Sequence, residues 1–213
     1  MTKLLVICAL LAGSCAGQEL SFVKNAPFTA TAVTETVQTL TDGNTTTRKT
    51  TALISRDSEG RTRREQSPIV FIHDPVARIA WILDSRSRTA RRVTVASTDV
   101  ASTNQKTMGG ESLGPDVIAG LNVEGTRLTR VLAPGQAGNE RPIQVATEAW
   151  YSTELQTAVR TKTTDPRIGE TDYKLTDIQR GEPDRSLFQI PADYSQQEGF
   201  TSPVPARRLD REK

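Results

Sequence analysis

The stretch from Phe28 to Arg56 reads FTATAVTETVQTLTDGNTTTRKTTALISR, and it decides the fold class. Its two arms, residues 28–41 and 45–56, are rich in Thr, Val and Ile, which favour β-strands. Between the arms stands Asp42-Gly43-Asn44, and Gly and Asn tolerate the positive φ that a tight hairpin turn requires. The stretch therefore predicts two long antiparallel strands joined by a tight turn.

The chain beyond Arg56 keeps the same texture of short Thr-, Val- and Ile-rich stretches, broken by Gly, Asp, Asn and Pro. No long stretch keeps a helical period, and neighbouring strands joined by tight turns pair antiparallel. The sequence therefore predicts a mainly β fold, a single antiparallel meander sheet. The expected strands are 28–41, 45–56, 61–67, 69–73, 78–84, 89–95, 122–132, 143–151, 155–164 and 170–180.

The sequence predicts one domain over residues 28–194, preceded by a short lead-in at 17–27. Residues 96–112 are Ser, Thr, Asn, Gln and Gly with few apolar side chains, which predicts a mobile connection within that domain. One helical turn is expected at 115–119 and another at 183–187. Residues 188–194 are expected to dock on the end of the core. The polar, Pro-containing residues 195–213 are predicted to form a flexible tail.

The alternation of side chains indicates which face of the sheet meets solvent. Along 143–151, Ile143 and Val145 share one face, while Gln144 and Glu148 lie on the other, so one face is expected to be buried. The strand 79–83 is apolar on both faces. It is therefore expected to be central and covered on both sides.

Residues 1–16 have the three-part pattern of a secretory signal: a basic start, an apolar run over 4–12, and the small residues Ser14-Cys15-Ala16. The expected product is an exported protein, periplasmic or extracellular, that begins near Gly17. The alternative is lipidation at Cys15, although a lipoprotein box has a larger aliphatic residue where this chain has Ala12. Both cysteines, Cys8 and Cys15, lie inside the signal, so no internal disulfide is expected in the mature chain.

The composition narrows the class of protein more than its activity. The 213 residues carry a formal net charge of +2 and are 36% hydrophobic, which excludes a multi-span membrane protein and a fully disordered chain. Aromatic residues make up 5% and there is one histidine. We therefore expect no nucleic-acid binding, and any membrane contact to be peripheral.

The order of these segments resembles that of exported bacterial proteins with the LolA/LolB-like fold. The resemblance rests on Ile79-Ala80-Trp81-Ile82-Leu83-Asp84 followed by the basic strand at 88–92, on Glu124-Gly125-Thr126-Arg127, on Trp150-Tyr151 and on the closing segment 184–191. A group of exported proteins with no assigned activity also shares stretches like 56–65 and 138–143.

The resemblance implies an open, strongly curved half-barrel. In lipoprotein carriers its concave side holds acyl chains, and in envelope-stress regulators it serves as a sensor domain. The carriers cover that side with several helices. This sequence offers at most two helical turns, so a shallower pocket is expected.

Two sets of residues are candidates for binding. A groove for an acyl chain is expected to be lined by Trp81, Leu83, Ile54, Leu128 and Trp150. Trp81 is assigned to the concave face because it shares its parity with the larger side chains. The alternative is that these side chains fill the core of the sheet.

The second set is basic and comprises Arg61, Arg63, Arg91 and Arg92. It would meet a lipid phosphate or an acidic partner protein. The alternative is that these arginines lie on solvated strand faces and pair with Glu59, Glu65 or Glu148.

No constellation of catalytic residues stands out. His73 and Asp74 are sequence neighbours on a strand, so they point to opposite faces and are interpreted as structural. Asp57, Glu59 and Asp84 fit no standard oxygen cage for a cation. We therefore expect no catalytic residues, no metal and no cofactor.

Two functions follow from the sequence. The first is a non-enzymatic envelope protein that binds a lipid, a lipopeptide or an envelope component in its concave face. The second is a structural or sensory module that binds an envelope protein through its basic strands and holds no small ligand.

Overall fold

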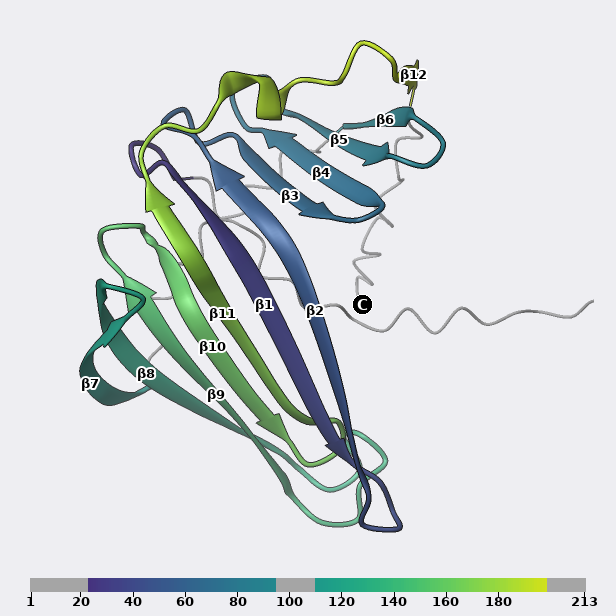
Figure 1. Ribbon diagram of the computed structural model, residues 1–213. Coiled ribbons are helices and arrows are strands. Elements are labelled where there is room, and N and C mark those ends of the chain that lie inside the picture. The colour runs from purple at the N-terminus through teal and green to yellow at the C-terminus, as the bar shows by residue number, and fades with distance from the viewer. Residues whose placement is uncertain (1–22, 95–109, 199–213) are drawn as a thin grey trace, which may run out of the picture.

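The computed structural model describes residues 23–94 and 110–198, and these residues form one 12-stranded sheet (Figure 1). The order of strands is β12-β6-β5-β4-β3-β2-β1-β11-β10-β9-β8-β7. Their bounds are β1 Phe28–Thr39, β2 Thr45–Arg56, β3 Thr62–Gln66, β4 Ile69–Asp74, β5 Ile79–Asp84, β6 Thr89–Thr94, β7 Glu111–Ile118, β8 Leu121–Leu132, β9 Ile143–Ser152, β10 Thr157–Asp165, β11 Gly169–Arg180 and β12 Ser195–Gln197. The predicted fold class, mainly β with one curved meander sheet, is confirmed.

The hairpin that decides the fold is formed by β1 and β2, which pair in register from Phe28↔Arg56 to Thr39↔Thr45. Gly43 has a φ of +82°, and the amide of Leu40 donates to the carbonyl of Asn44 at 2.7 Å. The turn chemistry therefore acts as the sequence predicts. On its other side β1 pairs with β11, so β1 joins the N-terminal and C-terminal halves of the sheet.

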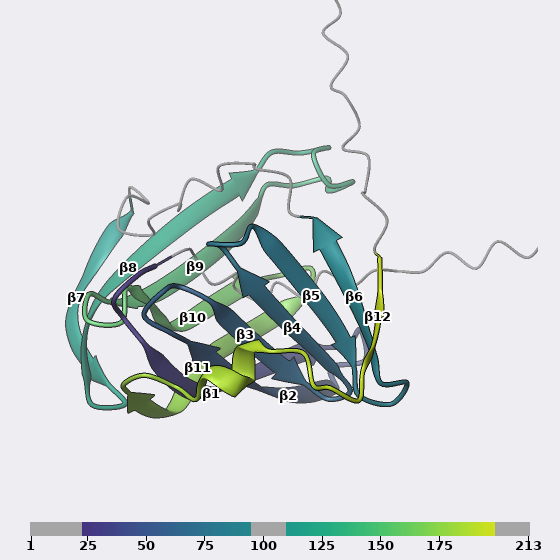
Figure 2. The same ribbon diagram turned by 90° about the horizontal axis from the view of Figure 1, so that it is seen from above.

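The sheet curls without closing into a barrel, as Figure 2 shows from above. Ala30, Ala32 and Ile54 share one face because they lie in register across β1 and β2. On that face Arg56, at the end of β2, donates to the carbonyl of Leu155 in the turn between β9 and β10. A side chain reaches across the intervening strands β1, β11 and β10 only if the sheet bends toward that face. We call it the inner face.

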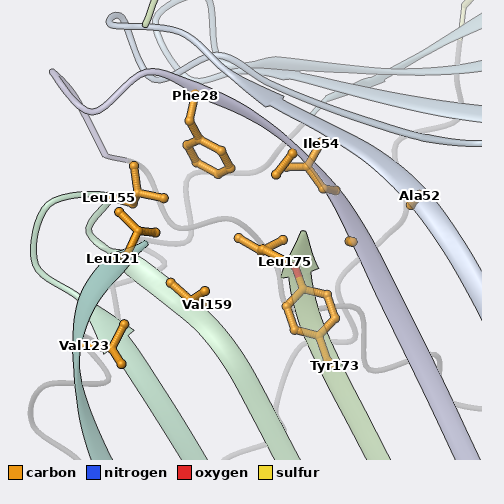
Figure 3. Close-up of a cluster of buried hydrophobic side chains, with 11 residues drawn as sticks. Phe28, Ala52, Ile54, Leu121, Val123, Leu155, Val159, Tyr173 and Leu175 are labelled. Atoms are coloured by element: carbon orange, nitrogen blue, oxygen red, sulfur yellow. The ribbon is translucent and has the colours of Figure 1, made fainter. Parts of the chain in front are cut away.

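A cluster of buried side chains fills one end of the inner face (Figure 3). Phe28, Ile54 and Leu175 are each at most 2% exposed. The cluster comprises Phe28, Ala30, Ala32, Ala52, Ile54, Leu121, Val123, Leu155, Val159, Tyr173 and Leu175. This core replaces the open groove that a half-barrel would otherwise have at this end.

A second, smaller cluster forms on the opposite, outer face of β4–β6. Its buried members are Val70, Ile72, Leu83 and Ala90, with Trp81 packed against them. The cover is the C-terminal segment, whose 3-10 turn η2 spans Arg185–Phe188 and whose Phe188, Ile190 and Tyr194 pack on the cluster. The expected helical turn near 183–187 and the docking of 188–194 are both confirmed.

Several local predictions are wrong. Residues 115–118 continue strand β7, and no helical turn forms there, because Ala119 and Gly120 make a turn with positive φ directly into β8. Glu111 and Ser112, expected in the mobile connection, also belong to β7. Ser195–Gln197, expected in the flexible tail, form β12, which pairs with β6 in parallel.

The strand 79–83 is likewise misplaced by the sequence prediction. β5 is the third strand from one end of the sheet, and Leu83 is its buried residue while the others are half-buried. The signal at 1–16 with Cys15, residues 96–109 of the connection and the tail from 199 onward lie outside the described residues.

Candidate functional site

One row of side chains crosses the inner face from β2 to β6. Strand register aligns Ile54, Arg64, Phe71, Ile82 and Arg91, one from each strand. Directly opposed residues of antiparallel strands share a face and lie about 5 Å apart. We call these five residues the inner row. It continues the face that carries the buried cluster, because Ile54 belongs to both.

The inner row changes from core to exposed surface along its length. Ile54 is 2% exposed, Arg64 and Ile82 are half-buried, and Phe71 is 47% exposed. An aromatic ring that is half exposed on a concave face offers an apolar contact surface. The inner row therefore offers an apolar centre, Phe71 and Ile82, between two guanidinium groups.

The positive charge of Arg64 also acts on Tyr173 of β11. Burial raises the pKa of Tyr173 on β11 to about 12, and the nearby positive charge of Arg64 partly offsets that rise. Arg64 donates to the amide oxygen of Gln66 at 3.3 Å. The guanidinium of Arg64 thus lies on the inner face, and its positive charge acts on the Tyr173 hydroxyl.

Threonines line much of the inner face between the core and the hairpin tips. These half-buried threonines are Thr34, Thr36, Thr50, Thr147, Thr161, Thr163 and Thr171. The hydroxyls of Thr36 and Thr171 lie 3.3 Å apart, and those of Thr147 and Thr163 lie 3.5 Å apart. These methyl-bearing hydroxyls give a surface that is partly apolar and able to hydrogen bond.

Arg56 closes the core end of the inner face. It is fully buried, and its Nε and Nη2 donate to the carbonyl of Ala26 at 3.0 and 2.9 Å. Its guanidinium lies 4.8 Å from the centre of the Phe28 ring. Burial lowers the pKa of Arg56 to about 10, and Nη1 has no hydrogen-bond partner. The fold therefore keeps a desolvated cation whose hydrogen-bonding capacity is only partly used.

The structure divides the predicted groove residues between the two faces. Ile54 lies in the inner core, and Leu128 is half-buried on the inner face opposite Thr147. Trp81 and Leu83 lie in the outer cluster under the C-terminal segment, so their assignment to the concave face is wrong. The physical reason is that both faces of β5 are apolar, and the segment that covers one of them comes from a distant part of the chain.

Trp150 is half-buried and packs against the inner core from β9. Its Nε1 would lie 3.0 Å from a Cβ placed on Gly125, and the guanidinium of Arg160 lies 5.2 Å from its ring. It is therefore a packing residue at the strand pair β8–β9 and contributes nothing to the inner row.

The four predicted surface arginines do not form one patch. Arg61 pairs with Asp57 and Glu59, and Arg63 pairs with Glu65 at 2.7 Å while donating to the carbonyl of Leu187. Arg91 and Arg92 are exposed on opposite faces of β6. The expected pairing with Glu59 and Glu65 is confirmed, and half of the set serves the fold rather than a partner.

The carboxylates of Asp57 and Asp74 accept hydrogen bonds within turns. Asp57 is 1% exposed and its Oδ1 accepts from the amides of Glu59 and Arg61, while Asp74 accepts from Val76 and Ala77. His73 lies on the inner face between Thr62 and Ala80. Within residues 23–94 and 110–198, no three His, Cys, Asp or Glu side chains gather closely enough to hold a metal ion.

Two cavities lie away from the inner row. One, of about 300 Å³, lies on the outer face between β1–β3 and the C-terminal segment, and its lining includes Leu53, Ser55, Arg63 and Leu187. The other, of about 410 Å³, lies where β1 ends beside the β10–β11 turn around Ile168. Both are open, mixed polar surfaces rather than enclosed apolar pockets.

Sequence reasoning missed Arg64 and placed no weight on Ile82. The signal was present, because Ile82 alternates with Trp81 along β5 and Arg64 alternates with Arg63 along β3. Only the register with Ile54 tells which set faces inward.

Comparison with known proteins gives likenesses of structure alone. No family model matches the chain, and no curated protein matches it in sequence. An uncharacterized conserved protein from Thermus thermophilus is similar in structure at 10% identity, with 81% of this chain and 90% of that chain covered and a TM-score of 0.47.

Two further solved structures are similar. One is a chain in the MucA/MucB complex of Pseudomonas aeruginosa, with 13% identity and a TM-score of 0.41. The match covers 78% of the present chain but only 56% of the chain in that complex. A LolA superfamily protein from Nitrosomonas europaea, from the superfamily that the sequence resembles, shares 12% identity over 76% of this chain and 90% of that chain, with a TM-score of 0.25. Identities at this level transfer no function to this chain.

Among the residues that the structure describes, no helix has the length and apolarity to cross a membrane.

Proposed function

We propose that this chain is an exported, non-enzymatic protein of the bacterial envelope that binds a lipidic ligand on the inner face of its half-barrel. The observation that supports this best is Phe71, an aromatic side chain 47% exposed at the centre of the inner row. Half-buried Ile82 lies directly opposite it, and the threonine-lined wall lies on strands beyond β2. An acyl chain would cover the ring of Phe71 and remove apolar surface from water.

The expected contribution of Phe71 follows from its exposed area. A Phe side chain presents roughly 200 Å², of which about 90 Å² is free at this exposure. At about 25 cal/mol per Å², covering that area contributes about 2 kcal/mol, or a factor of about 30 in affinity.

The experiment is a titration with a fluorescent long-chain fatty acid. We expect saturable binding by the unmodified protein with a Kd on the order of micromolar, about −8 kcal/mol. Phe71→Ala should weaken it at least tenfold with unchanged circular dichroism, because the side chain is largely outside the core. Val131→Ala, which removes an apolar side chain 55% exposed on the outer face of β8, is the matched control and should bind normally. Failure of the unmodified protein to bind any acyl ligand would refute the proposal and leave binding of an envelope protein as its successor.

A further inference from the structure

Opposite charges are paired on the outer face of the sheet. The ion pairs there are Arg63–Glu65 within β3 and the cross-strand pairs Arg127–Glu148, Arg160–Asp172 and Lys162–Glu170. Strand register places all four on the face opposite the buried inner cluster. The outer face therefore supplies countercharges to these four basic side chains.

The inner face of β2–β6 lacks such countercharges. Its basic residues are Arg48, Arg56, Arg64 and Arg91, and its acidic residue is Asp84. Asp84 is occupied by the amides of Arg86 and Ser87 in the β5–β6 turn. Within the described ranges, none of these four arginines forms an ion pair with a carboxylate, and Nη1 of Arg56 has no partner at all.

The geometry of the inner row combines this charge with the apolar surface. Arg64 and Arg91 flank the apolar centre, with Phe71 and Ile82 between them. Three strand spacings of about 4.8 Å separate the two arginine backbones, so either guanidinium can meet the head of a molecule whose chain covers Phe71. Arg64 is half-buried, whereas Arg91 is exposed.

Resting on the proposed function, we infer that the ligand of the inner face is an amphiphile with an acidic headgroup, a carboxylate or a phosphate monoester. Half-buried Arg64 binds the headgroup, Phe71 and Ile82 contact the acyl chain, and the charge of Arg91 at the far end of the row adds to the attraction. Arginine suits this task because its planar fork donates two parallel hydrogen bonds to such oxyanions. The ligand supplies the negative charge that the inner face lacks.

The test compares three ligands with one alkyl chain: a long-chain fatty acid, the corresponding alkyl phosphate and the corresponding fatty alcohol. Each is titrated against the fluorescent acyl probe at low and at physiological salt. We expect the two acids to bind about tenfold tighter than the alcohol, a ratio that corresponds to about 1.4 kcal/mol, because charge-assisted hydrogen bonds are the strong ones. Salt should narrow the difference, since Arg91 is exposed.

Arg64→Gln should remove most of the preference for the acids and leave the alcohol unaffected. Arg91→Gln should also reduce the preference for the acids. Because Arg91 is exposed, this second variant still tests the inference if Arg64→Gln fails to fold. Arg92→Gln, an exposed arginine on the outer face of the same strand, is the matched control and should keep the preference.

The outcomes separate the two claims. Equal binding of acid and alcohol would overturn this inference and leave the proposed function standing, whereas binding of none of the three ligands would overturn both. Inorganic phosphate and acetate distinguish a headgroup from a free anion, and we expect each to bind at least a hundredfold more weakly than its alkyl counterpart. Equal affinity for inorganic phosphate would overturn the acyl part of the inference.

Discussion

Replacing Arg56 by Met tests whether this buried cation fastens the curvature of the half-barrel. Methionine keeps an unbranched chain against Phe28 and removes the charge and three hydrogen bonds, two to Ala26 and one to Leu155. Each such bond to a charged donor contributes about 1.5–3 kcal/mol, or about 4.5–9 kcal/mol together.

Burial of the positive charge of Arg56 opposes this stabilisation. A pKa of about 10 in place of 12.5 means that burial disfavours the protonated guanidinium by about 3 kcal/mol, at about 1.4 kcal/mol per pKa unit. The balance predicts that Arg56→Met lowers the free energy of unfolding by about 1–6 kcal/mol. Against a typical total of about 5–15 kcal/mol, that is a large loss.

Urea melts followed by circular dichroism measure this change. The matched control is Arg48→Met on the same strand and the same face, where the side chain is exposed, and its effect should stay within about 0.5 kcal/mol. A variant Arg56→Met as stable as the unmodified protein, or more stable, would refute the reasoning. Desolvation would then outweigh the hydrogen bonds, and Arg56 would not fasten the fold.

Three other changes test the fold. Gly43→Val should lower the free energy of unfolding by about 1–3 kcal/mol in a urea melt, because Gly43 has a φ of +82° that a β-branched residue resists. A Cβ there would meet no atom within 4 Å, so the cost is purely conformational, and an unchanged urea midpoint would contradict this backbone strain. Trp81→Ala should lower the free energy of unfolding by about 2–4 kcal/mol and leave fatty-acid binding intact, since Trp81 packs under the C-terminal segment on the outer face. Loss of binding with unchanged stability would show instead that Trp81 contacts the ligand on the inner face. Hydrogen bonds from Arg167 lower the pKa of the Asp165 carboxyl, so its stabilisation is complete above the unfolded value of about 3.9 and disappears as pH falls through the lowered pKa. Asp165→Asn should therefore lower the urea midpoint most at pH 7 and progressively less as the pH falls below about 3.9, and an equal loss at every pH would contradict this role.

Local chemistry explains which parts of the fold could be predicted from the sequence. The β1–β2 hairpin depends on Asp42-Gly43-Asn44 and on the residues beside it, so the pattern contains nearly all of the information. The start of β7 resembles a turn in sequence because Gly114 and Pro115 commonly mark turns. A register shift between Ser112 and Gly114 accommodates them at the edge of the sheet, where a proline does little harm.

The candidate site depended on information that the sequence does not hold locally. Trp81 and Ile82 are both large and apolar, and the face each occupies is decided by what covers it. Phe188 and Tyr194, roughly a hundred residues away, cover Trp81, which leaves Ile82 and Phe71 on the inner face. Arg64 can be identified as a site residue only once the inner face is known, because its register with Ile54 places it on that face.

The separation of charge by face, rather than the number of arginines, carries the inference about the ligand. An exposed arginine without a partner is ordinary, and surface ion pairs contribute little to stability. Arg92 is such a case on the outer face. On the inner face the situation differs, because Arg64 is half-buried, lies opposite Phe71 in the inner row and has no carboxylate partner within the described residues. Desolvating a cation without a countercharge costs free energy. A fold that keeps this cost on its concave face, beside an exposed Phe71, has charge and apolar surface that an acidic amphiphile would satisfy together.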